Sequence, residues 1–255
     1  MARKDDQRPP AYPFAERGSR PSRRRFFELL GGAASAALLQ ACDSEGPRSA
    51  HEILEWAERK NESVERALFH AASRDHVAPG RRLAGNMFPK YFVSDEMPVW
   101  DPATRGAWAL EISGAVKRPV TFTLEALTKL RGVTQRVNHY CVEGWVARAE
   151  WTGVRLSDIA GMVEPTADAA YVDFQSFDSE YHESWDVDSA LHPQTLIAYA
   201  MDGHYLGPGH GAPARVHSPV KLGYKNTKYL TRVVFMPLRN GGYWTDRGYE
   251  WYGGT

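Results

Sequence analysis

The first clear pattern along the chain is a helical repeat of apolar positions within residues 51–72. Ile53, Leu54, Ala57, Val64, Ala67 and Leu68 recur there at helical spacing, with polar residues between them. This spacing predicts one amphipathic helix. We expect its apolar face to pack on the part of the chain that follows.

From residue 108 onward, the pattern changes to short segments that alternate or are continuously apolar. Strands are predicted at residues 108–114, 133–140 and 171–177, a helix at 156–162, a short apolar element at 196–201, and strands punctuated by Gly and Pro at 214–235. Thr123 is placed to cap a short helix that begins at Leu124. Short strands interleaved with short helices, without the regular rhythm of a doubly wound sheet, predict a mixed α+β domain.

Ahead of these elements lies a segment with the order of an export signal. Residues 22–28 read Ser-Arg-Arg-Arg-Phe-Phe-Glu, and the apolar residues 29–41 follow. This order resembles a twin-arginine signal, and the apolar stretch is too short and too rich in glycine to span a bilayer. A basic amphipathic anchor or an exposed arginine run is the alternative. Because the twin-arginine route carries folded proteins, often after cofactor insertion, it favours a redox cofactor.

The apolar stretch ends in Leu39-Gln40-Ala41-Cys42, which resembles a bacterial lipobox. Cleavage before Cys42 and addition of a diacylglyceryl group to its sulfur would anchor the protein to a membrane. Plain cleavage after the alanine-rich stretch, with Cys42 left as a free thiol, is the alternative. Asp43 is typical of some lipoproteins that stay in the inner membrane.

These segments predict the organisation of the whole chain. We expect a signal peptide with lipobox at residues 1–41, a polar tether at 42–50, a helical segment at 51–78 and the main domain at 79–255. The protein would then lie on the periplasmic side of the bacterial inner membrane, held there by its lipid.

Composition narrows the class of protein. The 255 residues are 43% hydrophobic and 24% charged, which excludes a disordered or collagen-like chain. The net charge of zero hides an excess of base in residues 1–41, and the remainder carries 23 basic and 27 acidic residues. The body therefore lacks the basic footprint of a nucleic-acid-binding protein. Two cysteines, Cys42 and Cys141, exclude a cysteine-rich zinc module; composition alone leaves a single disulfide open.

The second cysteine stands in a segment rich in functional side chains. Residues 138–145 read Asn-His-Tyr-Cys-Val-Glu-Gly-Trp. A lone cysteine at a strand end is usually a small buried hydrophobic residue, and a reactive or ligating thiol is the alternative. Four more motifs accompany it in order: GAVKRP at 114–119 with FTL at 122–124, HGAPAR at 210–215, GYKNTK at 223–228, and GYW at 242–244 with Gly248-Tyr249.

Together these five motifs resemble the molybdopterin-binding domain of the sulfite oxidase superfamily. The resemblance covers about residues 80–252 and is nearest to the bacterial periplasmic branch with the catalytic subunits of protein-methionine-sulfoxide reductases. It implies a single domain of mixed sheets with short helices. The C-terminal dimerisation domain of many sulfite oxidases has no counterpart in the motif order, so we expect a monomer.

The resemblance also implies a cofactor and its ligands. Molybdenum would be held by a pyranopterin dithiolene and by the thiolate of Cys141, with Cys141 and Glu143 as catalytic residues. Contacts to the pterin and its phosphate are implied for Asn86, Ser176, His210, Arg215, Lys225, Asn226, Thr227 and Lys228. Taken alone, the basic residues would more simply form a solvated face, and His210 would be a surface histidine.

Substrate choice is indicated by the residues after the cysteine. Sulfite oxidases of the eukaryotic type use arginines to hold their anionic substrate, whereas this chain supplies Glu143 and Trp145. A carboxylate beside the thiolate would repel a dianion, and an indole adds an apolar wall. This favours a neutral oxygen donor, such as a sulfoxide or N-oxide, protein methionine sulfoxide among them. Glu143 could equally be a structural carboxylate, with Arg148 as its partner.

Three other functions stay open at this point. The first is a sulfite dehydrogenase that passes electrons to a cytochrome, and the second is a non-catalytic binding lipoprotein without cofactor. The third is a zinc site built from His139, His182, His204, His210 or His217, whose spacing fits no common zinc motif.

Electron transfer requires a further protein. The sequence contains no Cys-x-x-Cys-His, no set of iron–sulfur cysteines and no Gly-x-Gly-x-x-Gly. We therefore expect a separate partner, either a membrane haem protein, a quinone-linked protein or a cytochrome.

Overall fold

The computed structural model describes residues 50–69, 81–83, 88–178 and 180–255. The chain divides into two compact units after Trp56, and the fold below is that of the second unit, Ala57–Thr255. The predictions for the export signal, Cys42, most of the tether and Asn86 lie outside the described residues. The predicted boundary between residues 78 and 79 does too, and it stays a prediction.

A five-stranded sheet forms one half of this unit. Its order is β3 (Val120–Thr123), β2 (Ala109–Gly114), β11 (Leu230–Met236), β6 (Tyr171–Ser176) and β7 (His182–Asp186), and only β2 and β11 run parallel. One face of β2 is buried through Leu110 and Ile112, as the alternation in the sequence predicts.

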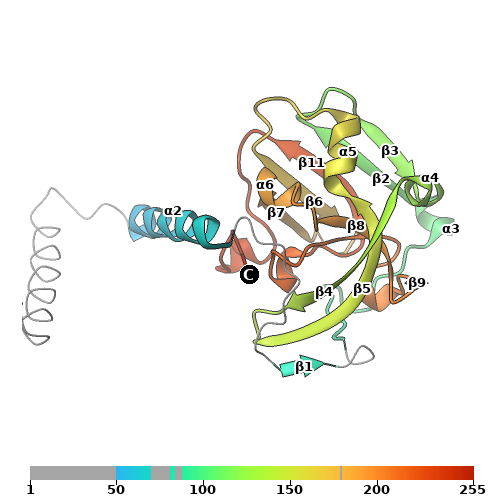
Figure 1. Ribbon diagram of the computed structural model, residues 1–255, viewed down its shortest axis with the longest axis horizontal. Helices are drawn as coiled ribbons and strands as arrows, with labels where there is room; N and C mark the ends of the chain where they lie inside the picture. Colours follow the sequence, from blue (N-terminus) through green and yellow to red (C-terminus); the bar gives the residue numbers. More distant parts are fainter. Residues whose placement is uncertain (1–49, 70–80, 84–87, 179) are drawn as a thin grey trace, which may run out of the picture. The chain divides into compact units, whose positions relative to one another are not determined.

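The second sheet is built around the long strand β5 (Trp145–Arg155), seen beside β4 in Figure 1. One edge of β5 pairs along its length with β4 (Gly132–Tyr140). The other edge is shared by β1 (Arg81–Leu83) and β8 (Leu196–Met201), and β8 in turn pairs with β9 (His204–Tyr205) and β10 (Arg215–His217).

Gly153 explains how β8 fits against β5. The pairing register shifts between Thr152 and Gly153, and a Cβ at Gly153 would lie 2.3 Å from the carbonyl oxygen of Ile197. No side chain fits there, so glycine permits the close approach of the two strands.

The main hydrophobic core joins the two sheets. Side chains of the first sheet, such as Phe174 and Phe235, belong to the same buried cluster as Val154, Ile197 and Val216 of the second. Helix α5 (Leu156–Val163) adds four buried apolar residues to this cluster. A second buried cluster includes Val137, Trp151 and Ala198 of the β4–β5–β8 sheet.

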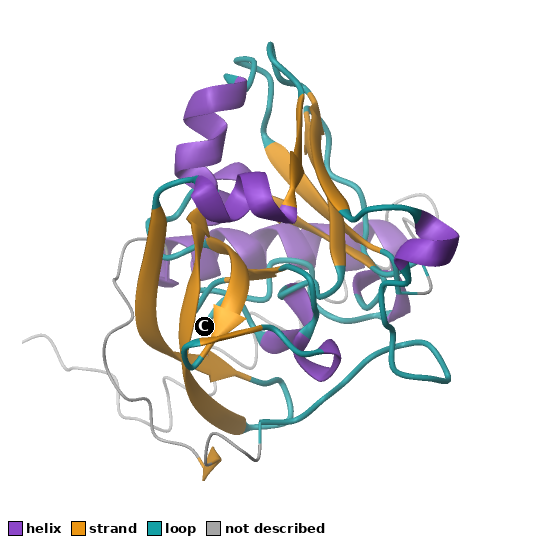
Figure 2. Ribbon diagram, turned by 90° about the vertical axis from the view of Figure 1, so that its right-hand side faces the viewer, coloured by secondary structure: helices purple, strands orange, loops and turns teal. Residues whose placement is uncertain are grey.

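The remaining helices are short, as Figure 2 shows beside the strands. They are α3 (Pro102–Arg105), α4 (Leu124–Lys129) and α6 (Val187–Ala190), with 3₁₀ turns η2 (Pro208–His210), η3 (Gly223–Lys225) and η4 (Thr245–Arg247). Thr123 caps α4 as predicted, because its hydroxyl oxygen accepts a hydrogen bond from the backbone N–H of Ala126 at 3.1 Å.

The predicted α+β class is confirmed, and the elements predicted at 108–114, 133–140, 156–162, 171–177 and 196–201 match β2, β4, α5, β6 and β8 within two residues. The predicted amphipathic helix is α2 (Ala50–Phe69). Strands β1, β3, β5, β7 and β9 were not predicted. In β7 the residues His-Glu-Ser-Trp-Asp show no apolar alternation, although four of the five are buried.

Ion pairs hold the later turns of α2 to the rest of its unit. Arg239 reaches Glu58 at 3.1 Å and Glu62 at 3.4 Å, and Arg66 reaches the buried Asp186 at 3.4 Å. The expected packing of the apolar face is wrong at Val64, whose side chain is 55% exposed. The contacts that hold the helix at these positions are polar instead. Within the described part of the chain, no helix is both long and apolar enough to cross a membrane.

The polar residues of β7 are buried because they are paired. The ammonium of Lys225 lies 2.7 Å from a carboxylate oxygen of Glu183, and neither side chain is exposed. Glu183 also accepts from the backbone N–H of Trp244 at 2.9 Å. A Cβ at Gly242 would lie 2.4 Å from the same carboxylate, so glycine leaves the space that Glu183 fills.

We expect Glu183→Gln to lower the free energy of unfolding by about 3 kcal/mol, because it leaves the buried Lys225 without its counter-charge. Equilibrium urea unfolding followed by tryptophan fluorescence measures the change. Glu125→Gln is the matched control, since its pair with Lys129 is exposed on both sides and should contribute less than about 0.5 kcal/mol. Equal effects of the two substitutions would contradict the expectation.

Candidate active site

Cys141 opens the tight turn that joins β4 to β5. The backbone N–H of Gly144 donates to the carbonyl of Cys141, and the N–H of Cys141 donates to the carbonyl of Trp145, both at 3.0 Å. Gly144 has a φ of +81°, and a Cβ added to it would meet no atom within 4 Å, so the backbone conformation rather than space calls for glycine here. The turn presents the side chains at 141 and 143 at one edge of the sheet.

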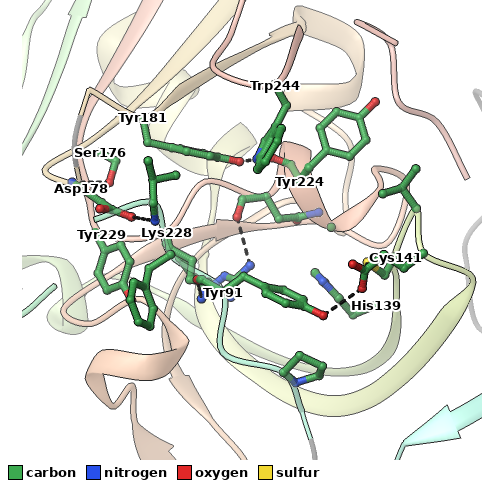
Figure 3. Close-up of a pocket in the computed structure, with 18 of the residues that line it drawn as sticks. Tyr91, His139, Cys141, Ser176, Asp178, Tyr181, Tyr224, Lys228, Tyr229 and Trp244 are labelled. Atoms are coloured by element: carbon green, nitrogen blue, oxygen red, sulfur yellow. Dashed lines mark hydrogen bonds between the residues drawn. The ribbon is translucent and has the colours of Figure 1, made fainter. Parts of the chain in front are cut away.

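A cavity of about 380 Å³ lies next to this turn. Its walls come from four places in the chain: the β4–β5 turn, the segment 88–93, the end of β6 with its following loop, and the loops from 215 to 249. Figure 3 shows Cys141, Tyr91, Tyr181, Tyr224 and Trp244 among the side chains that surround it. Aromatic rings therefore form much of the wall, as is typical of a small-molecule site.

Glu143 is fixed at the edge of this cavity. One of its carboxylate oxygens accepts hydrogen bonds from the hydroxyl of Tyr91 at 2.8 Å and from the indole N–H of Trp145 at 3.0 Å. The sulfur of Cys141 lies 3.9 Å from the same oxygen. The donors Trp145 and Tyr91 lower the pKa of Glu143 below its ordinary value, so the carboxylate is charged at neutral pH.

Arg148 is not the partner of Glu143, contrary to one of the possibilities above. It lies on β5 three residues beyond Trp145, and alternation along a strand turns the two side chains to opposite faces. The two donors to Glu143 are Tyr91 and Trp145 instead, and no ion pair within the described residues joins Arg148 to Glu143.

The thiol of Cys141 is half-buried and free. Burial raises its pKa above the ordinary value, and the nearby carboxylate of Glu143 acts in the same direction. The surroundings alone therefore do not activate this thiol as a nucleophile. A bound metal ion would deprotonate it outright, so the environment suits a metal ligand better.

Two cations face the cavity from the opposite side. The guanidinium of Arg215 is buried and donates to the backbone carbonyls of Asn226 at 3.0 Å and His210 at 3.2 Å. The ammonium of Lys228 donates to the carbonyls of Gly209, at 3.0 Å, and Tyr91. Among the described residues neither cation forms an ion pair with a carboxylate.

Their burial has an electrostatic consequence. Burial lowers the pKa of Arg215 to about 10, and burial together with the charge of Arg215 lowers that of Lys228 to about 7. An anion between them would offset the repulsion and the lost hydration. The donor set therefore fits a group with an anionic phosphate, such as a pyranopterin cofactor.

The other residues that the resemblance implies as cofactor contacts are only partly at the cavity wall. Ser176 and Asn226 line the cavity. The amide of Asn226 shapes its loop, since it accepts from the N–H of Ser218 at 2.6 Å and donates to the carbonyls of Lys221 and Leu222. The hydroxyl of Thr227 is buried without a hydrogen-bond partner in the described structure.

Lys225 and His210 do not reach the cavity wall. The ammonium of Lys225 points to Glu183 in the interior, so its implied contact with phosphate has no support in this geometry. His210 packs edge-on against Phe88, and burial lowers its pKa to about 4, so the ring is neutral.

Several wall residues had not been predicted. They are Phe88, Tyr91, Phe92, His139, Asp178, Tyr181, Tyr229, Trp244 and Tyr249, with Tyr224 known only as a motif residue. Trp244 and Tyr249 belong to the closing motif at 242–249, and that motif could have indicated them as cavity residues. Asp178 had none: it accepts from the backbone N–H groups of Val93 and Ser94 at 2.8 and 2.9 Å and fixes a distant segment.

The histidines lie in different parts of the fold. His139 and His217 are buried neighbours, with ring nitrogens 3.4 Å apart. His182 is bound to Asp173 at 2.9 Å on the β6–β7 strands. The described residues include no group of three or more histidine, cysteine or acidic side chains arranged to hold a metal ion.

Comparison with known proteins gives the class. The model of the oxidoreductase molybdopterin binding domain matches residues 96–244, and the chain belongs to this family. It is a molybdenum-dependent oxidoreductase with a molybdopterin cofactor.

Its relatives carry more specific names. The chain is 35% identical to a putative protein-methionine-sulfoxide reductase subunit, YedZ1, of Azospira oryzae, over 92% of this chain and 88% of that one. It is 28% identical to the protein-methionine-sulfoxide reductase catalytic subunit MsrP of Burkholderia mallei, over 91% and 74%. The sulfane dehydrogenase SoxCD of Paracoccus pantotrophus matches 51% of this chain and 38% of its own, with 21% identity and a TM-score of 0.49.

In the protein prepared without cofactor, Arg215 and Lys228 should bind an anion with an affinity that depends on pH. Sulfate keeps its charge between pH 6 and 9, whereas Lys228, with its pKa near 7, loses its proton over this range. We expect the affinity for sulfate, measured by calorimetry, to fall by up to about tenfold per pH unit above pH 7.

In Lys228→Met the affinity should be weaker and independent of pH. Lys117→Met removes an exposed lysine that pairs with Glu164, and it should behave like the unmodified protein. A flat pH profile in the unmodified protein would show that Lys228 does not hold the anion.

Proposed function

We propose that this protein reduces a neutral sulfoxide or N-oxide by oxygen-atom transfer at a molybdenum ion ligated by Cys141. Protein methionine sulfoxide is the substrate that the names of its relatives support. The observation that carries the proposal is the charged carboxylate of Glu143, fixed 3.9 Å from the sulfur of Cys141.

The chain would bind its cofactor from two sides. Cys141 supplies the thiolate, and Arg215 and Lys228 balance the anionic phosphate tail across the cavity. When bound, the molybdenum–pterin group supplies the two-electron transfer of an oxygen atom. Asn226 keeps the cation-bearing loop in place through its three hydrogen bonds to backbone groups.

The remaining side chains would select and hold the substrate. The carboxylate of Glu143 repels an approaching oxyanion, whereas the dipole of a sulfoxide is tolerated. The rings of Tyr91, Trp145 and Trp244 form an apolar wall suited to the alkyl part of the substrate. These rings also exclude water, which strengthens the charge interactions in the cavity.

Electrons would come from a separate protein, such as a membrane haem protein, a quinone-linked protein or a cytochrome. The relatives are named as a subunit and as a catalytic subunit, which supports a partner of this kind. Export by the twin-arginine route and a lipid on Cys42 are part of the proposal and rest on the sequence of residues 22–42. They would place the protein beside a membrane partner on the periplasmic side.

A sulfite dehydrogenase is the second candidate. The cations Arg215 and Lys228, which have no carboxylate partner among the described residues, favour it, because they could hold an anionic substrate if the cofactor left one of them free. A screen of the loaded enzyme with sulfoxides, N-oxides and sulfite separates the two functions. Cytochrome reduction at low sulfite concentration, without sulfoxide turnover, would replace the proposed function by this one.

We expect Cys141→Ser to abolish turnover of every substrate while the protein stays folded, because a hydroxyl is a poor ligand for molybdenum at neutral pH. Molybdenum analysis, circular dichroism and turnover are measured on the same preparation. Leu238→Ser, at an exposed position, controls for the substitution itself. Full turnover in Cys141→Ser would refute the ligand assignment.

Export of the protein and its anchoring to the membrane are tested separately. Replacing Arg23 and Arg24 by Lys should keep the full-length protein in the cytoplasm, because the twin-arginine route requires both guanidinium groups. Cys42→Ser should instead leave export intact and shift the protein from the membrane to the soluble periplasmic fraction. Fractionation with immunodetection gives the result, and membrane-bound Cys42→Ser would argue against a lipid anchor.

A further inference from the structure

The segment 88–94 crosses the cavity between its two charged sides and is fixed at several points. Asp178 accepts from the backbone N–H groups of Val93 and Ser94, and from the hydroxyl of Ser94 at 2.5 Å. Phe88 is buried against the ring of His139, with the centroids 5.1 Å apart. Tyr91 lies between these two attachments.

Tyr91 touches both charged sides of the cavity. Its carbonyl accepts from the ammonium of Lys228. Its side chain points toward the Cys141 side of the cavity, as Figure 3 shows, and its hydroxyl donates to Glu143 at 2.8 Å. Its ring also lies beside that of Trp145, with the centroids 6.4 Å apart.

Glu143 depends on such contacts for its position. It lies in an exposed turn, where a glutamate side chain would otherwise sample several rotamers. Trp145 supplies one donor from the adjacent strand end, only two residues away. Tyr91 supplies the other from a segment 52 residues away, which is itself anchored to Asp178 and Lys228.

We propose that Tyr91 is a positioning residue that sets substrate specificity, because it holds the Glu143 carboxylate where it excludes anionic ligands from the space beside Cys141. The proposal deepens the proposed function and rests on it for the identity of the neutral substrate. Charge repulsion falls with distance, so a carboxylate released into solvent discriminates less against an oxyanion than one fixed at the cavity edge.

The test measures two dissociation constants on the molybdenum-loaded protein by calorimetry. Sulfate is the anionic probe and dimethyl sulfoxide is the neutral probe. Glu143→Gln should tighten sulfate binding relative to dimethyl sulfoxide by about tenfold. Tyr91→Phe should change the same ratio in the same direction by about threefold, because Trp145 still restrains the carboxylate.

The double variant separates positioning from a general structural role. If Tyr91 acts through Glu143, the double variant Tyr91→Phe with Glu143→Gln should show the same ratio of dissociation constants as Glu143→Gln alone. A general loosening of the cavity would weaken both probes, and an additive effect would mean that Tyr91 acts independently; either result overturns the proposal. Tyr205→Phe, which removes an exposed hydroxyl on β9, is the control and should leave the ratio unchanged.

The ratio of dissociation constants tests the role of Tyr91, and sulfoxide turnover tests the proposed function, so the two can be refuted separately. If the ratio shifts as expected in a protein that reduces no sulfoxide, the proposed function is wrong and the role of Tyr91 stands. If sulfoxide is reduced and the ratio does not respond to Tyr91→Phe, the role of Tyr91 is wrong and the function stands.

Discussion

The buried ion pair between Lys225 and Glu183 is the contact on which the shape of the cavity depends. It joins β7 to the 223–228 loop, and Glu183 extends the link to the backbone of Trp244 in the closing motif. The indole N–H of Trp185 adds a hydrogen bond to the carbonyl of Lys225 at 3.0 Å. Removing two charges from water costs several kcal/mol for each ion, and good geometry with further donors offsets that cost. Both conditions hold here, because both Glu183 oxygens accept hydrogen bonds. Asn226 directly follows Lys225 in the chain, and the N–H of Trp244 donates to Glu183, so this pair positions two residues of the cavity wall.

Charge is divided across the cavity in a way that follows from this framework. Lys228 of the 223–228 loop and Arg215 of β10, which donates to the carbonyl of Asn226, lie on one side, where backbone carbonyls, rather than carboxylates, are their partners. The β4–β5 turn brings the anionic Glu143 and the thiol of Cys141 to the other. Carbonyl groups orient a cation without cancelling its charge, so the cationic side retains attraction for an anion. A ligand with a phosphate tail at one end and a metal at the other matches this division, whereas a small oxyanion beside Cys141 meets a like charge.

The sequence pattern predicted elements such as β2 and β6, whose burial follows from apolar alternation, and it missed β7, where burial depends on polar partners. It also missed the long strand β5, although the buried Ala147, Ala149 and Trp151 alternate there with more polar positions. Strands β2 and β6 were predicted because hydrophobic residues alternate along them, and β7 was missed because its Glu183 and Asp186 are buried through ion pairs that no local pattern reveals. The motifs located Cys141, Glu143, Arg215 and Lys228 at one cavity. They could not reveal Tyr91 or Asp178, because these residues act through contacts spanning 52 and 85 positions of sequence. The pairing of Glu143 with Arg148 was wrong for a related reason, since it considered nearness in sequence and not the alternation of side chains along β5.

The two lysines of the GYKNTK motif show why a motif is not yet a list of ligands. Lys225 and Lys228 are three residues apart, and their ammonium groups have different partners. Lys225 meets a carboxylate and becomes part of the framework, whereas Lys228 meets carbonyls and a neighbouring guanidinium. Burial lowers the pKa of both; the charge of Glu183 opposes this effect at Lys225, and the charge of Asp178 opposes it at Lys228. Only Lys225 is held in an ion pair, so Lys228 is the lysine able to respond to an anionic ligand. Lys225, whose charge is paired with that of Glu183, instead stabilises the loop that carries Lys228.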